Sequence, residues 1–452
     1  MELLERIKSP KIEPLFKSLY GTDTMATVRS RYERVVTALL NFPETPISAP
    51  GVALRDFPEL SGDIRLFSAP GRTELGGNHT DHNHGKVIAA SIHLDALAAV
   101  APRSDKLAIF RSIGNPYPYP DAVVDLTKTD PQEGDVGTIN GIIRGIGAEF
   151  ARRGIAVPGF TAVVDSAVKA GAGLSSSAAM EALVCRIFSS LSGADVAPLE
   201  LAKMGQYAEN RYFGKPSGLM DQIACMHGGV VAIDFENPEY PRIEPIYFDL
   251  GYIGYTLCVV DTGGSHADLA EDYASIPREM QGVAGFFGKA VLRELRQNEV
   301  MEKAGEIRKQ LGDRALLRAL HYFSENKRVD SMAQILRNKN SLLDRQEQQS
   351  VLGRFFALVN ESGSSSWRLL QNIYSTTNTA DQGIALALTL TRIFFPNTSA
   401  SRVHGGGFAG TIQAYIPASS LDFYRNEMEA VFGPGAVTPL QIRSAGAIEL
   451  AL

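Results

Sequence analysis

Hydrophobic and polar positions follow two different periods along the 452-residue chain, and each period predicts its own kind of element. Apolar residues recur at helical spacing within residues 1–45, which indicates helices there. Residues 64–68 alternate before Pro70-Gly71 and predict a short strand that ends in a turn. The small and β-branched residues of 87–100 predict a buried strand.

Strands and helices are mixed along the rest of the chain. The pattern predicts strands at 160–165, 230–234, 257–261 and 411–416, and helices at 138–151, 178–191, 278–297, 315–326, 330–338 and 381–393. Because they do not alternate regularly, we expect an α+β fold rather than a doubly wound sheet. A boundary near 240–255 divides the chain into an N-terminal part, 1–250, and a C-terminal part, 251–452.

Charge and cysteine usage narrow the class of protein. The 44 basic and 50 acidic side chains give a net charge of −6, which argues against broad binding to nucleic acid or to membrane surfaces. Cys185, Cys225 and Cys258 are widely spaced in apolar surroundings, so neither a disulfide framework nor a zinc site is indicated. No signal peptide or membrane span is visible, and we expect a cytoplasmic protein.

A glycine- and serine-rich loop lies between a predicted strand and a predicted helix. Strand, glycine turn and helix together present backbone N–H groups to an anion, and serine hydroxyls can donate to phosphate or coordinate Mg²⁺. The same residues also fit a serine-rich cap on an ordinary helix. The candidate phosphate-binding residues are Gly171, Ala172, Gly173, Leu174, Ser175, Ser176 and Ser177.

Two further polar stretches are candidate sites. Residues 70–85 hold His79, His82 and His84, which fit no usual zinc spacing but suit recognition of a hydroxyl-rich small molecule; a solvated loop is the alternative. Downstream, one of the carboxylates of Glu209 and Asp221 could hold Mg²⁺ while the other abstracts a proton. Both are also compatible with solvated surface acids.

Four motifs together resemble a known family. Residues 70–81 resemble the signature P-G-R-V-N-L-I-G-E-H-T-D, and residues 171–178 resemble the phosphate loop G-x-G-L-S-S-S-A. Residues 214–222 resemble a stretch ending G-I-M-D-Q, and residues 405–410 resemble G-G-G-F-G-G. In this order and over this length, the chain is similar to the GHMP small-molecule kinases, and among them to the galactokinases.

The resemblance implies a fold and a reaction. It implies a ribosomal-S5-like N-terminal lobe, a ferredoxin-like C-terminal lobe and ATP-dependent phosphorylation of a sugar's anomeric hydroxyl. Asp221 aligns with the catalytic aspartate and Arg72 with the arginine that stabilises its charge. Ser177 and Glu209 align with Mg²⁺ ligands, and the amides of 171–177 with the groups that hold ATP. The residues that align with sugar contacts are Asn78, His79, Asp81, Gly218 and Tyr273.

The chain departs from the galactokinase pattern within the signature itself. Asn78 stands where galactokinases carry a glutamate that contacts the C6 hydroxyl, and Glu74 replaces an asparagine. Thr73 replaces a valine, and Ala409 replaces a glycine. Without a negative charge at position 78, the site would no longer repel a sugar that carries a carboxylate at C6. Glu74 would repel such a sugar if its side chain faces the sugar.

Three functions therefore stay open at this level. They are a galactose 1-kinase, a uronic-acid 1-kinase and a sugar sensor that binds galactose and ATP without turnover. The segment 175–178, which differs in the fungal sensor, is intact here and favours catalysis. The sequence assigns no role to His82, His84, His93 or the apparent insertion at 50–63, and it does not indicate an oligomeric state.

Overall fold

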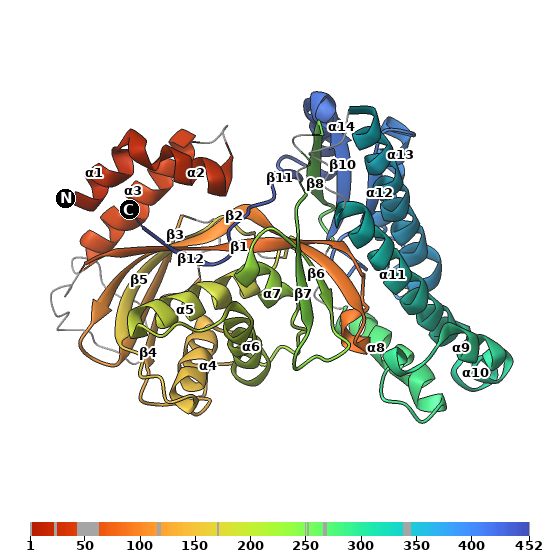
Figure 1. Cartoon of the computed structure of the whole chain (residues 1–452), viewed down its shortest axis with the longest axis horizontal. Coiled ribbons are helices and arrows are strands. Elements are labelled where there is room, and N and C mark those ends of the chain that lie inside the picture. The colour runs from red at the N-terminus through yellow and green to blue at the C-terminus, as the bar shows by residue number, and fades with distance from the viewer. Residues whose placement is uncertain are drawn as a thin grey trace.

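The computed structural model describes residues 2–21, 25–42, 63–114, 119–169, 171–248, 250, 253–264, 269–337 and 345–451. The expected insertion at 50–63 lies outside these residues except for Asp63. Two sheets organise the described chain, and Figure 1 shows them in the left and right halves of the molecule.

The first sheet has eight strands, in the order β12-β1-β2-β5-β3-β4, with β6 and β7 attached through β2. Neighbouring strands are antiparallel except for β3 and β5, which are parallel. The strands are β1 (Arg65–Gly76), β2 (Lys86–Arg103), β3 (Leu107–Ile113), β4 (Ala122–Asp125), β5 (Gly159–Ser166), β6 (Val230–Asp234), β7 (Arg242–Ile246) and β12 (Ile448–Leu450).

Helices cover both faces of this sheet (Figure 1). On one face, α1 (Glu2–Lys8), α2 (Glu13–Tyr20) and α3 (Met25–Leu40) pack on Leu97, Ile109 and Val163. The other face packs against α4 (Ile139–Arg152), α5 (Ser176–Ser192), α6 (Pro198–Ala208) and α7 (Met220–His227). Successive residues of a strand point to opposite faces, so buried strands read as continuous apolar runs when both faces are covered.

The second sheet has four strands, in the order β11-β8-β10-β9. They are β8 (Tyr255–Asp261), β9 (Ala400–Val403), β10 (Thr411–Pro417) and β11 (Val437–Leu440), all paired antiparallel. One face packs on α13 (Gly383–Phe394) and α14 (Leu421–Phe432). The other face packs on α12 (Arg345–Ser365) and α11 (Asp313–Arg337), in an apolar cluster that also contains Leu75 and Ile88 of the first sheet. One hydrophobic core therefore joins the two sheets.

A helical segment lies at one end of α11. It consists of α8 (Ala270–Phe286), α9 (Gln297–Glu302) and α10 (Ala304–Leu311), which pack on α11 around Met280 and Ala319. Among the described residues, no helix combines the length and apolar character that crossing a membrane would need.

The α+β prediction is confirmed, and most predicted elements are present within a few residues of their expected bounds. The turn predicted at Pro70-Gly71 is wrong, because β1 continues to Gly76 with irregular register at Pro70/Arg72 and at Glu74/Gly76. The helix predicted at 278–297 ends at Phe286, and the two predicted at 315–326 and 330–338 form the single helix α11. A lobe boundary near 250 stays a prediction; the final strand, β12, pairs with β1 in the first sheet.

Candidate active site

Arg72 and Asp221 form the centre of the candidate site. Arg72 lies on β1, and Asp221 lies in the first turn of α7. The guanidinium donates two parallel hydrogen bonds to the carboxylate, Nε to Oδ1 at 2.7 Å and Nη2 to Oδ2 at 2.8 Å. This planar pairing fixes the orientation of the carboxylate as well as its charge. The Asp221 side chain keeps 31% of its surface exposed, so it is available to a ligand.

The surroundings of Asp221 keep it ionised. Burial opposes its ionisation, but the charge and hydrogen bonds of Arg72, with a hydrogen bond from Ser175 Oγ, hold its pKa below the ordinary value. An ionised carboxylate at neutral pH can accept a proton from a hydroxyl.

The glycine loop lies directly beside this pair. Its Leu174 carbonyl accepts the Arg72 N–H at 3.1 Å, and the Gly173 carbonyl accepts a hydrogen bond from Arg72 Nη1. Gly171, Gly173 and Ser175 all have positive φ, and a Cβ on Gly173 would lie 2.9 Å from His404 Nδ1. Glycine is therefore needed at 173 for both backbone conformation and space.

The loop leads into the N-terminus of α5. No side chain of the described residues caps this end of the helix. Unbonded N–H groups and the positive end of the helix dipole favour an anion here. Ala172 and Leu174 are buried and anchor the loop in the core, while Ser175, Ser176 and Ser177 stay partly exposed.

Ser177 and Glu209 lie together, as the sequence predicts for a shared ligand. Ser177 Oγ donates to Glu209 Oε1 at 2.9 Å, and Lys215 Nζ pairs with the same oxygen at 3.0 Å. Gln222 Nε2 bridges Glu209 and Glu181, and Glu181 Oε1 is buried with no hydrogen-bond partner in the part of the chain that the structure describes. Mg²⁺ prefers oxygen ligands. The Ser177 hydroxyl and the Glu209 carboxylate, close to the unpaired Glu181 oxygen, are ligands of this kind, so the residues fit that ion.

His79 and Asp81 lie in the turn that follows β1. His79 has a φ of 57°, and its Nε2 lies 2.9 Å from the Gly406 carbonyl of the second half of the chain. Asp81 lies against Gly218, where a Cβ would approach its Oδ2 to 2.4 Å. Burial, followed by the negative charges of Glu74 and Asp221, raises the pKa of Asp81 to about 6.

Tyr273 reaches the same place from α8. Its hydroxyl donates to the Gly407 carbonyl at 2.8 Å, and its ring packs edge-on against Phe408. A Cβ at Gly406 would lie 2.5 Å from the Tyr273 ring, which explains a glycine there. Phe408 has a positive φ but Ala409 does not, so the alanine fits a position where the family motif has glycine.

Asn78 differs from the other predicted sugar contacts, because protein atoms use both the nitrogen and the oxygen of its side-chain amide. Nδ2 donates to the Gly405 carbonyl at 2.8 Å and to Glu74 Oε1 at 3.4 Å. Oδ1 accepts from Asn372 at 2.9 Å and from Ser366 at 3.3 Å. Asn78 is only 1% exposed, and its role as a sugar contact stays a prediction.

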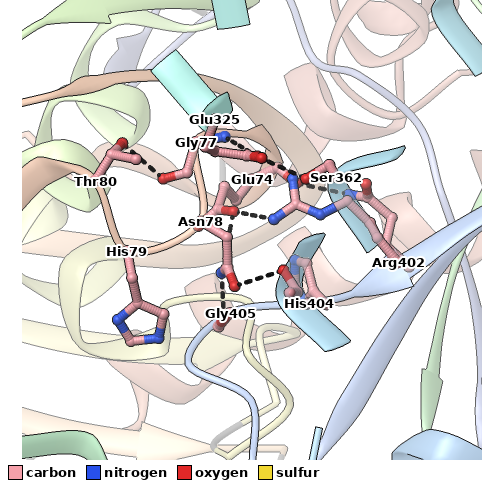
Figure 2. Close-up of polar contacts among 12 residues, drawn as sticks. Glu74, Gly77, Asn78, His79, Thr80, Glu325, Ser362, Arg402, His404 and Gly405 are labelled. Atoms are coloured by element: carbon pink, nitrogen blue, oxygen red, sulfur yellow. Dashed lines mark hydrogen bonds and ion pairs between the residues drawn. The ribbon is translucent and has the colours of Figure 1, made fainter. Parts of the chain in front are cut away.

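Sequence reasoning missed a group of residues on α11 and α12 that holds this turn (Figure 2). Glu325 accepts from the Gly77 N–H at 3.2 Å and from Ser362 Oγ at 2.6 Å. His321 Nε2 lies 2.9 Å from the Asn78 carbonyl. His321 and Glu325 are four residues apart on the buried face of α11, and two ionisable residues on such a face are the signal that could have found them.

Comparisons with known proteins agree with this arrangement. Residues 139–229 match the family model "GHMP kinases N terminal domain", and residues 56–102 match "Galactokinase galactose-binding signature". A galactokinase of Glaesserella parasuis is 28% identical, over 79% of this chain and 86% of the relative. A galactokinase of Streptomyces coelicolor is also 28% identical, over 81% and 88%.

Solved structures share the fold. A Lactococcus lactis galactokinase complexed with galactose has a TM-score of 0.72 at 22% identity, over 92% of this chain and all of that one. A mevalonate kinase of Methanococcus jannaschii has a TM-score of 0.56 at 14% identity, over 84% and 99%. The two matched segments, the galactokinase relatives and the shared fold agree with the site geometry, and together they indicate a sugar kinase that is similar to the galactokinases among the GHMP kinases.

Proposed function

We propose that this chain transfers the terminal phosphoryl group of ATP to the anomeric hydroxyl of galactose and forms galactose 1-phosphate. The observation that carries the proposal is the bidentate Arg72–Asp221 pair beside the glycine loop at the start of α5. It combines a proton acceptor, a fixed positive charge and an anion-binding helix end in one place. The galactokinase relatives and the matched galactose-binding signature support the choice of sugar.

The chemical step assigned to Asp221 is proton acceptance from the anomeric hydroxyl, or its orientation for attack. Arg72 holds the carboxylate in one direction and lies where it can offset negative charge that develops on the transferred group. Phosphoryl transfer depends mainly on positioning and charge stabilisation, so fixed groups of this kind suit it.

The ATP side of the site is assigned to the loop 171–177 and the first turn of α5. Their backbone N–H groups would bind the phosphates, and the side chains of Ser177 and Glu209 would hold Mg²⁺. The ion supplies neutralisation of phosphate charge when it is bound. Lys215, which pairs with Glu209, adds positive charge at the same place.

The sugar side is assigned to the turn after β1 and the residues that contact it. We propose His79, Asp81, the backbone at Gly218, and Tyr273 as the sugar contacts, and we propose that Asn78, the fifth expected contact, acts instead through its protein partners. His79 and Tyr273 each bond to a carbonyl of the 405–410 glycine segment, so sugar binding would connect elements from both halves of the chain.

Two alternative functions are not favoured. A uronic-acid kinase was suggested by Asn78, but the relatives are galactokinases. A sensor without turnover would not need the Arg72–Asp221 pair beside an intact serine loop. We also propose lobes at 1–250 and 251–452 and a cytoplasmic enzyme, which three buried, free cysteines support.

The proposed function is tested by ATP turnover with Mg²⁺ against galactose, galactosamine, glucose, talose, galacturonate and glucuronate. We expect galactose-selective turnover that Asp221→Asn abolishes. Asp422→Asn, at a residue whose side chain is 94% exposed on α14, is the matched control and should leave turnover unchanged. Turnover with a uronate alone, or sugar binding with no turnover, would overturn the proposal.

A further inference from the structure

We propose that Glu74 is the specificity-determining acceptor of this site: its free carboxylate oxygen binds a sugar hydroxyl, at the end of the sugar away from Asp221. Asn78, at the position of the galactokinase glutamate, positions Glu74 by donating a hydrogen bond to its other oxygen. This inference rests on the proposed function and adds the residue that selects a neutral sugar.

The position of Glu74 on β1 places it in the site. Arg72 and Glu74 are two residues apart, and the pairing of β1 with β2 is regular between them. Their side chains therefore leave the same face of the strand, about 7 Å apart along it. Asp81 interacts electrostatically with both Glu74 and Asp221, so the three carboxylates lie around one site. A sugar whose anomeric hydroxyl meets Asp221 would therefore present its other hydroxyls towards Glu74.

Asn78 is poorly placed to bind a ligand, because its amide has no hydrogen-bonding position left. Both protons of Nδ2 are used by Gly405 and Glu74, and both acceptor positions of Oδ1 by Asn372 and Ser366. An amide offers two donors and two acceptors, so a sugar hydroxyl would have to displace a protein partner. Figure 2 shows Asn78 linked to Gly405 beside Glu74.

Glu74 has the opposite character. Its Oε1 accepts from Arg402 Nη2 and, weakly, from Asn78. None of the described residues donates a hydrogen bond to Oε2, although Glu74 is only 4% exposed. Oε2 is not among the buried atoms that lack a partner, so it keeps contact with solvent, and a ligand hydroxyl can donate to it in place of water.

Arg402 explains how the charge of Glu74 is kept in place. It is fully buried on β9, and the ion pair with Glu74 joins the two sheets. Within the described residues, its Nε and Nη1 have no hydrogen-bond partner, so Glu74 is the principal partner of its charge. A buried cation of this kind needs a carboxylate beside it. The carboxylate and the amide have thus exchanged positions 74 and 78 relative to the galactokinase signature, while both remain in contact.

The exchange has a consequence for specificity. An ionised carboxylate accepts a hydrogen bond from a hydroxyl but repels another carboxylate. Glu74 would therefore favour a neutral hexose over a uronate.

The test combines substrates that lack one hydroxyl with variants at position 74. The kcat and KM of the full-length enzyme are measured for galactose, its 2-, 3-, 4- and 6-deoxy forms and galacturonate. The variant is Glu74→Gln, and the matched control is Glu149→Gln, a buried, arginine-paired glutamate on α4. Glu74→Asp keeps the charge beside Arg402 while withdrawing the oxygen, and gives the same comparison if Glu74→Gln does not fold.

In the wild type, we expect the deoxy sugar that lacks the partner hydroxyl to lose about 10- to 100-fold in kcat/KM, mainly through KM, as for a charge-assisted hydrogen bond. In Glu74→Gln, the loss of kcat/KM for this one deoxy sugar relative to galactose should largely disappear. The losses for the other deoxy sugars should be unchanged, and discrimination against galacturonate should fall. Glu149→Gln should keep the wild-type profile. If Glu74→Gln loses as much kcat/KM as the wild type with each of the deoxy sugars, the inference is overturned. No wild-type turnover with galactose would overturn the proposed function and this inference with it.

Discussion

Two buried carboxylates on adjacent strands of the first sheet, Asp95 on β2 and Glu74 on β1, are paired with arginines in different ways. Asp95 accepts hydrogen bonds on both oxygens. Its four side-chain donors are Tyr20, Arg31, Ser68 and Arg443. Glu74 uses one oxygen for Arg402 and Asn78 and leaves the other without a donor among the described residues.

The comparison separates a structural charge from a functional one. Asp95 is fully buried; although burial opposes its ionisation, the charges of Arg31 and Arg443 hold its pKa below the ordinary value. Its bonds join α2, α3 and the C-terminal segment to the sheet, and they give each of its two oxygens a protein donor. Glu74 lies near Arg72, His79 and Asp81, where an incomplete set of bonds leaves a position for substrate. The number of unused acceptor positions, rather than burial, distinguishes the two.

The largest expected effect is at the reacting end of the site. Asp221→Asn should lower kcat by about 10²- to 10⁴-fold, because the proton acceptor is lost. Sugar binding, followed by calorimetry, should persist, because the amide keeps the shape of the side chain. Turnover near the wild-type value would remove Asp221 as the base.

Asp95→Asn should lower stability and leave turnover almost unchanged, in contrast to Asp221→Asn. Loss of the carboxylate leaves Arg31 and the buried Arg443 without their shared partner, and we expect the free energy of unfolding to fall by about 3–5 kcal/mol. Denaturant unfolding measures the loss, and kcat well below the unfolding transition should change little. A large drop in kcat with unchanged stability would contradict the division between the two carboxylates.

Asn78→Glu tests the exchanged pair. The new carboxylate at position 78 would repel the carboxylate of Glu74. It would also lack the N–H that Asn78 donates to the Gly405 carbonyl. The single variant should lose about 1–3 kcal/mol of stability, and Glu74→Asn in the same chain should recover much of this. Unfolding of the two single variants and the double variant gives the coupling energy. Simple additivity would mean that positions 74 and 78 do not act together.

The smallest expected effect is a pH dependence of sugar binding. The pKa of Asp81 is raised to about 6, so its carboxylate is protonated below that pH in the folded enzyme. If the ionised form accepts a sugar hydroxyl, the KM for galactose should rise as pH falls below 6, about tenfold per pH unit. Asp81→Asn should remove this dependence. A KM that is independent of pH between 5 and 7 in the wild type would exclude Asp81 as a titrating contact.

The sequence was sufficient to predict the fold class and the principal groups of the candidate site. Strands buried on both faces left clear apolar runs, and the glycine loop, Arg72 and Asp221 lie within short motifs. The structure brings together Ser177 with Glu209 and Arg72 with Asp221, although 149 residues separate the second pair. The path of β1 was not predictable in the same way, because Pro70-Gly71 usually ends a strand and is accommodated here by irregular register.

Partners from distant elements could not be predicted. Arg402 is 328 residues from Glu74, and Asn372 is 294 residues from Asn78. Their contacts depend on how the second sheet and its helices pack on the first, which local periodicity does not encode. For the same reason the sequence could place Asn78 in the signature but could not show that its amide is already used.

A crystal structure of the Asp221→Asn variant with galactose tests the account most directly, because the variant should bind the sugar without turning it over. We predict the anomeric hydroxyl beside residue 221 and another galactose hydroxyl about 3 Å from Glu74 Oε2, with Asn78 keeping its protein partners. Galactose bonded to the Asn78 amide, with Glu74 in contact only with Arg402 and Asn78, would contradict it.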